Sequence, residues 1–127
     1  MSFPRITRAE AEAIHAASLR MFGGLPGLRD AGALESALAQ PFQSFGGEEL
    51  YPTDAAKAAR LAFGIVSGHP FADGNKRAGA ALLGASLRMS GHAFAPDHDG
   101  FQRAVLAVAS GEWGYSELLA WVEANAG

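Results

Sequence analysis

The stretch that decides the fold of this chain reads His69-Pro70-Phe71-Ala72-Asp73-Gly74-Asn75-Lys76-Arg77. Proline disfavours the α region for the residue before it, so the preceding helix must end by about Gly68 and His69 is expected on extended backbone. Gly74 permits a tight turn. From Asn75 to Gly91 the small and apolar composition is helical. The stretch therefore predicts a loop that leads directly into a helix N-terminus.

This predicted helix N-terminus is a candidate site for an anion. The amides of Gly74 to Arg77 would have no carbonyl partner within the helix, and the helix dipole adds positive charge beside them. Lys76 and Arg77 stand in the first turn, where a cation opposes the dipole at a cost of roughly 0.3–1 kcal/mol. Arg offers a planar fork to phosphate oxygens and Lys a mobile point charge, so together they favour a bound polyphosphate.

Two more side chains of the stretch suit phosphate chemistry. Asp73 is the candidate ligand of Mg²⁺, a hard ion that takes few protein carboxylates when it also bridges phosphates. His69 is the candidate base for an incoming hydroxyl. Structural roles stay open beside these: Asp73 as a helix cap, His69 as a loop residue, and both cations as solvated charges. The convergence of all these groups within nine residues favours the functional interpretation.

The same residues carry a family resemblance. The stretch resembles the signature of the Fic/Doc superfamily, and its ending Asn75-Lys76-Arg77 is similar to that of the death-on-curing (Doc) type. Other segments similar to Doc-type proteins are Gly27-Leu28-Arg29-Asp30, Leu34-Glu35-Ser36-Ala37-Leu38 and Phe45-Gly46-Gly47-Glu48-Glu49-Leu50-Tyr51-Pro52. The resemblance covers most of the chain. It implies an all-α domain of about six helices around a central buried helix, with a small loop or hairpin flap.

The resemblance also implies a function. It indicates the toxin of a type II toxin-antitoxin pair, which transfers a phosphoryl group from ATP to a hydroxyl of a protein target, elongation factor Tu, and so halts translation. His69 would accept the proton, Asp73 would bind Mg²⁺, and Lys76 and Arg77 with the amides of residues 74–77 would neutralise the transferred group. Asn75 would fix the loop or touch phosphate. A flap beside the site would position the target through Phe45, Gly46, Gly47 and Tyr51.

The implied partner is a Phd-like antitoxin whose helix or tail folds into the active-site groove. Some Fic proteins inhibit themselves with a helix reading Ser/Thr-x-x-x-Glu-Gly/Asn. No segment here matches, because Ser44 and Glu48 are followed by Glu49. Restraint is therefore expected from another chain.

Two alternatives remain open. The first is transfer of AMP, the usual Fic reaction, but Fic proteins have a second glycine where this chain has Lys76, and a final arginine where it has Ala80. That glycine leaves room for phosphates and that arginine holds them, so both departures disfavour nucleotidyl transfer. The second alternative is a module without catalysis that only binds an antitoxin.

Capping signals predict the remaining helices. Thr7 with Glu10 forms a capping box for a helix to about Phe22, with Ile14, Ala17 and Met21 on one side and His15 as a partly exposed structural residue. The segment between Pro41 and Pro52 is expected as a structured loop or short hairpin. Asp97-His98-Asp99 is read as a cap rather than a metal cluster. The predicted caps of the later helices are Asp30, Thr53, an aspartate of the run 97–99 before a helix from Gly100 to Ala109, and Ser116.

Length and composition limit the number of domains and the classes of function. A chain of 127 residues fits one domain, 1–127. Ten Lys and Arg against 13 Asp and Glu give a formal net charge of −3, which argues against direct nucleic-acid binding. There is no cysteine, so thiolate chemistry and disulfides are excluded. We expect a cytoplasmic protein, since neither a signal peptide nor a membrane-spanning apolar run is evident.

Overall fold

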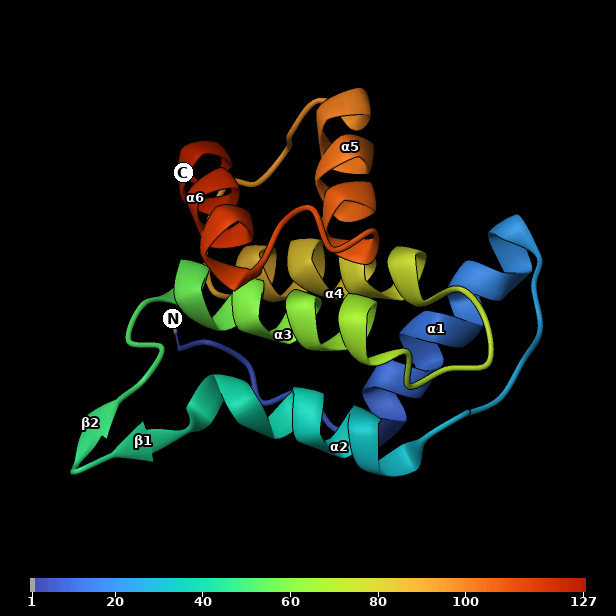
Figure 1. Cartoon of the computed structure of the whole chain (residues 1–127), viewed down its shortest axis with the longest axis horizontal. Helices are drawn as coiled ribbons and strands as arrows, with labels where there is room; N and C mark the ends of the chain where they lie inside the picture. The colour runs from blue at the N-terminus through green and yellow to red at the C-terminus, as the bar shows by residue number, and fades with distance from the viewer. Residues whose placement is uncertain (1) are drawn as a thin grey trace.

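The computed structural model describes residues 2–127 and is built almost entirely from helices. This range contains six α-helices, one short 3₁₀ helix and a single two-stranded hairpin that projects from one end of the helical body (Figure 1). The predicted all-α fold with a small hairpin is thereby confirmed. In chain order the elements are α1 (Arg8–Phe22), α2 (Ala31–Ala39), η1 (Gln40–Phe42), β1 (Ser44–Phe45), β2 (Glu48–Glu49), α3 (Asp54–Gly68), α4 (Asn75–Met89), α5 (His98–Ala109) and α6 (Tyr115–Asn125).

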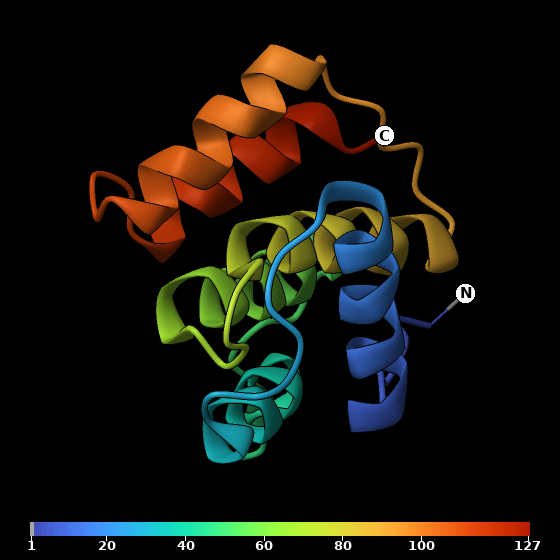
Figure 2. The ribbon, with the colours of Figure 1, turned by 90° about the vertical axis from the view of Figure 1, so that its right-hand side faces the viewer.

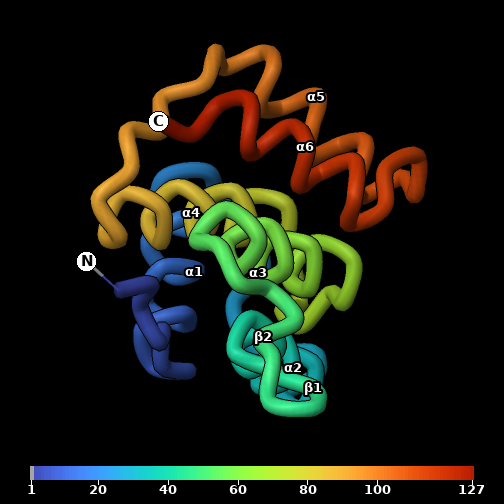
Figure 3. The backbone as a smooth tube through the Cα atoms, turned by 90° about the vertical axis from the view of Figure 1, so that its left-hand side faces the viewer, coloured from blue at the N-terminus to red at the C-terminus, as the bar shows by residue number. Residues whose placement is uncertain are grey.

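The helices form three layers. The antiparallel pair α3 and α4 lies in the middle, with α5 and α6 on one side and α1 and α2 on the other (Figures 2 and 3). One core cluster joins the middle layer to α5 and α6 and includes Leu83, Leu87, Val108 and Val122. A second joins it to α1 and α2 and includes Leu34, Ile65, Phe71 and Leu82. Both α3 and α4 contribute to the two clusters, so α4 is central as predicted but shares the middle of the fold with α3.

Small residues let α3 and α4 approach closely. A Cβ atom added to Gly79 of α4 would lie 2.5 Å from Cγ2 of Val66 on α3, a distance that real side chains do not reach. Gly64 of α3 faces α2 in the same way, because its added Cβ would lie 2.9 Å from Cβ of Ala37. Gly79 therefore sets the spacing between α3 and α4 within the middle layer, and Gly64 sets the spacing between α3 and α2.

Three predicted caps are confirmed, because the side chains of Thr7, Asp30 and Thr53 each accept a hydrogen bond from an amide of the first turn of their helix. In the run Asp97-His98-Asp99 the cap is Asp97, whose side chain accepts from the amide of Gly100, so α5 begins at His98, before the expected start at Gly100. Ser116 is a wrong prediction, because α6 already begins at Tyr115. Its N-terminus is instead closed by Glu117, whose Oε1 accepts from the amide of Gly114 at 2.7 Å.

The predicted hairpin is present between η1 and α3. Ser44 pairs with Glu49 and Phe45 with Glu48, across a turn in which Gly46 and Gly47 both have positive φ, 60° and 83°. This turn geometry is the one that matches the twist of paired strands, and it requires residues that tolerate positive φ. No helix within the described range of the chain is long and apolar enough to cross a membrane.

Candidate functional site

His69 follows the last turn of α3 and lies in the left-handed region, with φ 51° and ψ 53°. The prediction that the helix ends at Gly68 is confirmed, but the prediction of extended backbone at His69 is wrong. Its amide still donates to the carbonyl of Ile65 at 3.3 Å, so the residue closes the helix as a left-handed cap. Pro70 excludes only the right-handed helical conformation, and the hydrogen bond favours the left-handed one over the extended one.

The ring of His69 is exposed, and its orientation leaves one nitrogen available. Nδ1 lies 3.1 Å from the carbonyl oxygen of Ser67. A carbonyl oxygen can only accept, so in the neutral ring Nδ1 carries the proton of this contact and Nε2 keeps its lone pair. His69 therefore has the tautomer that a proton acceptor needs.

The loop after His69 is paired with the segment between α1 and α2. The amides of Arg29 and Asp30 both donate to the carbonyl of Pro70, at 2.8 and 3.0 Å, and the amide of Ala72 donates to the carbonyl of Gly27 at 3.0 Å. Leu28 and Phe71 form an antiparallel bridge. Residues 27–30 thus act as a short brace along the loop, which explains its fixed path without a regular strand.

Asn75 fixes the same loop from the other side. Its Oδ1 accepts from the amide of Phe71 at 2.9 Å, and its Nδ2 donates to the carbonyl of Phe71 at 3.1 Å. The side chain is buried, and both of its polar atoms are used. Of the two roles left open by the sequence, the structure supports loop geometry, so Asn75 can offer a phosphate only its backbone amide.

His15 of α1 belongs to the site although the sequence placed it as a partly exposed structural residue. It is only 4% exposed, and its Nε2 donates to the carbonyl of Asp73 at 2.7 Å. The buried face of α1 is formed by Ala11, His15 and Ser18, whereas Met21, placed by its spacing on one side with Ile14 and Ala17, is 77% exposed. Ala11, His15 and Ser18 are spaced by four and then three residues, which is the spacing of one helix face. This spacing was the available sign that His15 is buried, but the apolar residues nearby indicated a different face.

Asp73 holds the turn before α4 and is not its cap. Its Oδ2 accepts from the amide of Leu25 at 3.1 Å and its Oδ1 from the amide of Gly74 at 2.9 Å. These two hydrogen bonds, helped by the nearby charges of Arg77 and His15, lower the pKa of the Asp73 carboxyl below its ordinary value. The carboxylate is therefore charged at neutral pH.

The N-cap of α4 is Gly74, with φ 74° and no capping side chain. Its amide is occupied by Asp73, which corrects the expectation that all amides from Gly74 to Arg77 are free. The amides of Asn75, Lys76 and Arg77 remain without a carbonyl partner inside the helix. The helix thus offers three amides and its positive end to an anion.

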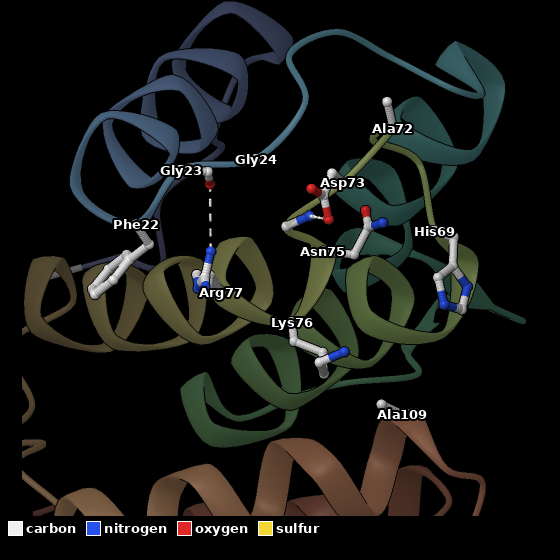
Figure 4. A pocket seen from close by; sticks show the side chains of 11 residues that line it. Phe22, Gly23, Gly24, His69, Ala72, Asp73, Asn75, Lys76, Arg77 and Ala109 are labelled. Carbon is white, nitrogen blue, oxygen red and sulfur yellow. Dashed lines mark hydrogen bonds between the residues drawn. The ribbon is translucent and has the colours of Figure 1, made fainter.

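These groups surround one cavity of about 510 Å³ (Figure 4). That volume is within the range of small-molecule sites. The cavity lies between the N-terminus of α4, the end of α1 and the end of α5. Its walls include all four predicted catalytic residues, His69, Asp73, Lys76 and Arg77. The lining residues that the sequence did not indicate are Phe22, Gly23, Gly24, Ala72 and Ala109.

The two cations do not extend into bulk water away from this cavity. The guanidinium of Arg77 lies 4.9 Å from the ring centroid of Phe22, and its Nη1 lies 3.5 Å from the carbonyl of Gly23. Lys76 projects on the side of His69 and Ala109 (Figure 4). Both positive charges therefore stand at the positive end of a helix and beside one hollow, an arrangement that a polyanion would stabilise.

The cavity offers one protein ligand for Mg²⁺, Asp73, and not the full set of ligands that a metal site made by the protein alone would need. Among residues 2–127, no three His, Cys, Asp or Glu side chains gather in a way that could hold a metal ion. Asp73 is charged and each of its oxygens keeps a free lone pair. A magnesium ion there would take its other ligands from water and from phosphate oxygens, as this ion commonly does.

The hairpin does not lie beside the cavity, contrary to what the resemblance implied. It precedes the first turn of α3, whereas His69 follows the last, and 15 residues of helix separate them by roughly 20 Å. Figure 1 shows the hairpin projecting from the end of α3 opposite the loop 69–74. Phe45 is 82% exposed at its tip, Gly46 and Gly47 form its turn, and Tyr51 packs edge-on against Tyr115 at 5.4 Å.

Comparison with known sequences agrees with the motif and its setting. A sequence model described as the Fic/DOC family matches residues 5–87, from before α1 to within α4. The chain is also 37% identical over 78 residues to the protein named Toxin Doc of Mycolicibacterium smegmatis, an alignment that covers 61% of this chain and 60% of that protein. The aligned part is thus less than two thirds of the relative. Because the family match takes in most of the chain, including the whole loop and the N-terminus of α4, the chain belongs to the Fic/DOC family.

Proposed function

We propose that this protein transfers the γ-phosphoryl group of ATP to a hydroxyl group of a protein target. One observation carries the proposal: a proton acceptor, a charged carboxylate, two cations and three helix-terminal amides line the same cavity. Phosphoryl transfer needs little covalent help from a protein and depends on positioning and charge stabilisation. The cavity provides groups for both.

Each residue has a definite task in this proposal. The amides of residues 75–77 and the side chains of Lys76 and Arg77 hold phosphate oxygens, and Asp73 provides the protein ligand for Mg²⁺, which would offset charge between phosphates. Nε2 of His69 takes the proton of the attacking hydroxyl. The new bond joins that oxygen to the γ-phosphorus, the bond from γ-phosphorus to the bridging oxygen breaks, and ADP leaves.

Two residues favour phosphoryl transfer over AMP transfer within this family. Lys76 projects toward the cavity at a position where Fic proteins have glycine, so it fills space beside the phosphates. Ala80, one turn further along α4, provides no charge at the position where Fic proteins have arginine. A triphosphate that extended along α4, as AMP transfer in Fic proteins would need, would thus have less space beside Lys76 and no arginine to bind it at position 80.

The position of the label distinguishes the two reactions. We expect elongation factor Tu incubated with the protein to acquire label from ATP labelled at the γ-phosphorus and none from ATP labelled at the α-phosphorus. A His69→Ala variant of equal stability is the matched control and should transfer neither label. Label from the α-position alone would refute the kinase proposal.

We further infer that the protein is a toxin restrained by a Phd-like antitoxin in the cytoplasm, where ATP and elongation factor Tu are both found. The name of the relative, Toxin Doc, supports the toxin part. The antitoxin part is supported by three exposed apolar side chains: Phe22, which lines the cavity, is 59% exposed, and Met21 and Leu25, close to it in the chain, are 77% and 65% exposed. An amphipathic helix or an ordering tail would bury such residues and close the cavity at the same time.

We propose that the hairpin helps to position the protein target, although it lies away from the cavity. Its exposed Phe45 and the glycines of its turn offer a surface and an accessible strand edge. Since the hairpin stands at the far end of α3, a target would have to contact the hairpin and place its hydroxyl at His69 across the length of that helix. Exchange of Phe45 for Ser should then raise the KM for the protein target while leaving the KM for ATP unchanged.

A further inference from the structure

We infer that Arg29 is a positioning residue for His69. It holds the backbone conformation from which the imidazole reaches the cavity. The structural part of this inference concerns the conformation of His69 alone, and its consequence for catalysis rests on the function proposed above.

Arg29 binds three consecutive carbonyl groups at the point where α3 becomes the loop. Its Nε donates to the carbonyl of His69 at 2.7 Å and its Nη2 to the carbonyl of Gly68 at 3.0 Å. Its backbone amide donates to the carbonyl of Pro70 at 2.8 Å. One residue from the segment between α1 and α2 therefore fixes both peptide planes that flank the α-carbon of His69.

His69 needs such support because its backbone conformation is unfavourable. Among residues 2–127 it is the only residue other than glycine with a positive φ. Side chains with a Cβ atom rarely adopt this region, and a residue persists there only when its surroundings determine it strongly. With Pro70 next in the chain, the accessible alternative for His69 is extended backbone, which would direct the ring away from its present position.

The guanidinium suits this position electrostatically. The last carbonyls of a helix have no amide partner within it and form the negative end of the dipole. A planar fork can donate to two neighbouring carbonyls at once, which an ammonium group does less well. Arg29 is exposed and does not line the cavity, so it acts through His69 rather than on a bound ligand.

The experiment compares Arg29→Ala and Arg29→Lys with a matched control, Arg88→Ala. Arg88 also donates to a backbone carbonyl beyond a helix end, that of Phe94 at 3.3 Å, but it belongs to the last turn of α4, away from the cavity. Two measurements are made on the full chain. The first is the set of backbone and ring chemical shifts of His69 by NMR. The second is phosphoryl transfer from γ-labelled ATP to elongation factor Tu.

For Arg29→Ala we expect the Cα and Cβ shifts of His69 to move toward extended values. We also expect kcat to fall about 10- to 100-fold with the KM for ATP unchanged, the scale expected for a displaced catalytic group. Arg29→Lys should recover part of both effects. Arg88→Ala should change neither.

The inference is overturned if the shifts of His69 in Arg29→Ala equal those of the wild type. It is also overturned if Arg29→Ala and Arg88→Ala lower kcat alike, because the effect would then follow general stability. Should the wild type transfer no phosphoryl group, the proposed function fails, and the NMR comparison still decides whether Arg29 positions His69.

Discussion

The imidazole of His15 lies flat on the ring of Phe71, with centroids 3.8 Å apart and planes inclined by 5°. Phe71 is a fully buried residue in the loop between α3 and α4, and the same imidazole donates to the carbonyl of Asp73 two residues later. One side chain of α1 thus fixes the loop at two points, by stacking and by a hydrogen bond. The position of the site depends on this contact between elements that are far apart in the sequence.

Exchange of His15 for Phe tests the hydrogen bond separately from the stacking. The phenyl ring keeps the contact with Phe71 but leaves the carbonyl of Asp73 without its donor, so we expect a loss of about 1–3 kcal/mol in the free energy of unfolding. His15→Ala also removes the stacked ring and should cost more, because it opens a cavity. Urea denaturation followed by circular dichroism measures both. Equal stability of His15→Phe and wild type would contradict the role of the bond.

Gly79 and Gly84 of α4 form a matched pair for testing helix packing. Gly79→Ala forces a methyl group against Val66 and the carbonyl of Ala62 on α3, so we expect a net loss of about 1–3 kcal/mol in spite of the better helix propensity of alanine. Gly84→Ala meets only the mobile guanidinium of Arg88 and should be neutral or slightly stabilising. Thermal unfolding of the two variants measures the difference. Similar melting temperatures would contradict the view that Gly79 allows α4 to pack closely on α3.

His92 gives the stability a defined dependence on pH. Its Nε2 lies 2.8 Å from Oδ2 of Asp54 and its Nδ1 2.8 Å from the carbonyl of Gly127. Chiefly the hydrogen bond to Asp54, and then that to Gly127, raise the pKa of His92 above its ordinary value of 6.5. A raised pKa means that the folded state binds the proton more tightly than the unfolded state. The stabilisation that His92 contributes is therefore complete below pH 6.5, and it disappears as the pH rises through the pKa of His92 in the folded state.

We therefore expect the difference in the free energy of unfolding between wild type and His92→Asn to shrink from about pH 6 to about pH 8. An imidazole loses its proton within this pH interval. Urea titrations at several pH values measure this difference. Asp54→Asn is the control and should flatten the same dependence. A difference that grows with pH would show that the sign assigned here is wrong.

His69→Ala should abolish most of the transfer activity while leaving the fold intact, since the side chain is exposed and only one of its ring nitrogens makes a hydrogen bond. A general base typically contributes a factor of roughly 10² to 10⁴ to the rate. Initial rates with γ-labelled ATP measure the loss, and circular dichroism checks the fold. Undiminished transfer by this variant would remove His69 from the mechanism.

Asp73→Asn should make transfer by the protein less responsive to Mg²⁺. The single oxygen of the neutral amide can still accept from the amide of Leu25, although the bond from the amide of Gly74 to the second oxygen is lost. The loop should survive, since it is also held by Asn75 and by residues 27–30, but the charge that attracts the ion is removed. We expect the concentration of Mg²⁺ needed for half-maximal rate to rise about 10-fold or more, within the range known for changed metal surroundings. The measurement is the rate as a function of Mg²⁺ concentration. An unchanged midpoint would mean that Asp73 serves the loop alone.

Much of the fold was evident from local sequence signals. Side-chain caps at Thr7, Asp30 and Thr53, together with the glycine pair of the hairpin, act on residues within a few positions, so they predict where helices begin and where the chain turns. The long run of small and apolar residues after Arg77 indicated the central helix, because only a helix buried on all sides can tolerate it. His69, Asp73, Lys76 and Arg77 were found for the same reason, since they are neighbours in the chain, whereas Phe22, Gly23, Gly24 and Ala109 reach the cavity from the ends of other helices.

Only the tertiary structure decided how those residues are held. His15 reaches Asp73 over 58 positions and Arg29 reaches His69 over 40, and such contacts leave no periodic pattern in a single sequence. The left-handed backbone of His69, the occupied amide of Gly74 and the place of the hairpin at the far end of α3 follow from these long-range contacts and from helix length. The sequence alone determined which chemical groups gather at the start of α4, because local order is enough to gather them. Their orientation was decided by packing between layers, because a loop takes one path only when distant elements bind its carbonyls and amides.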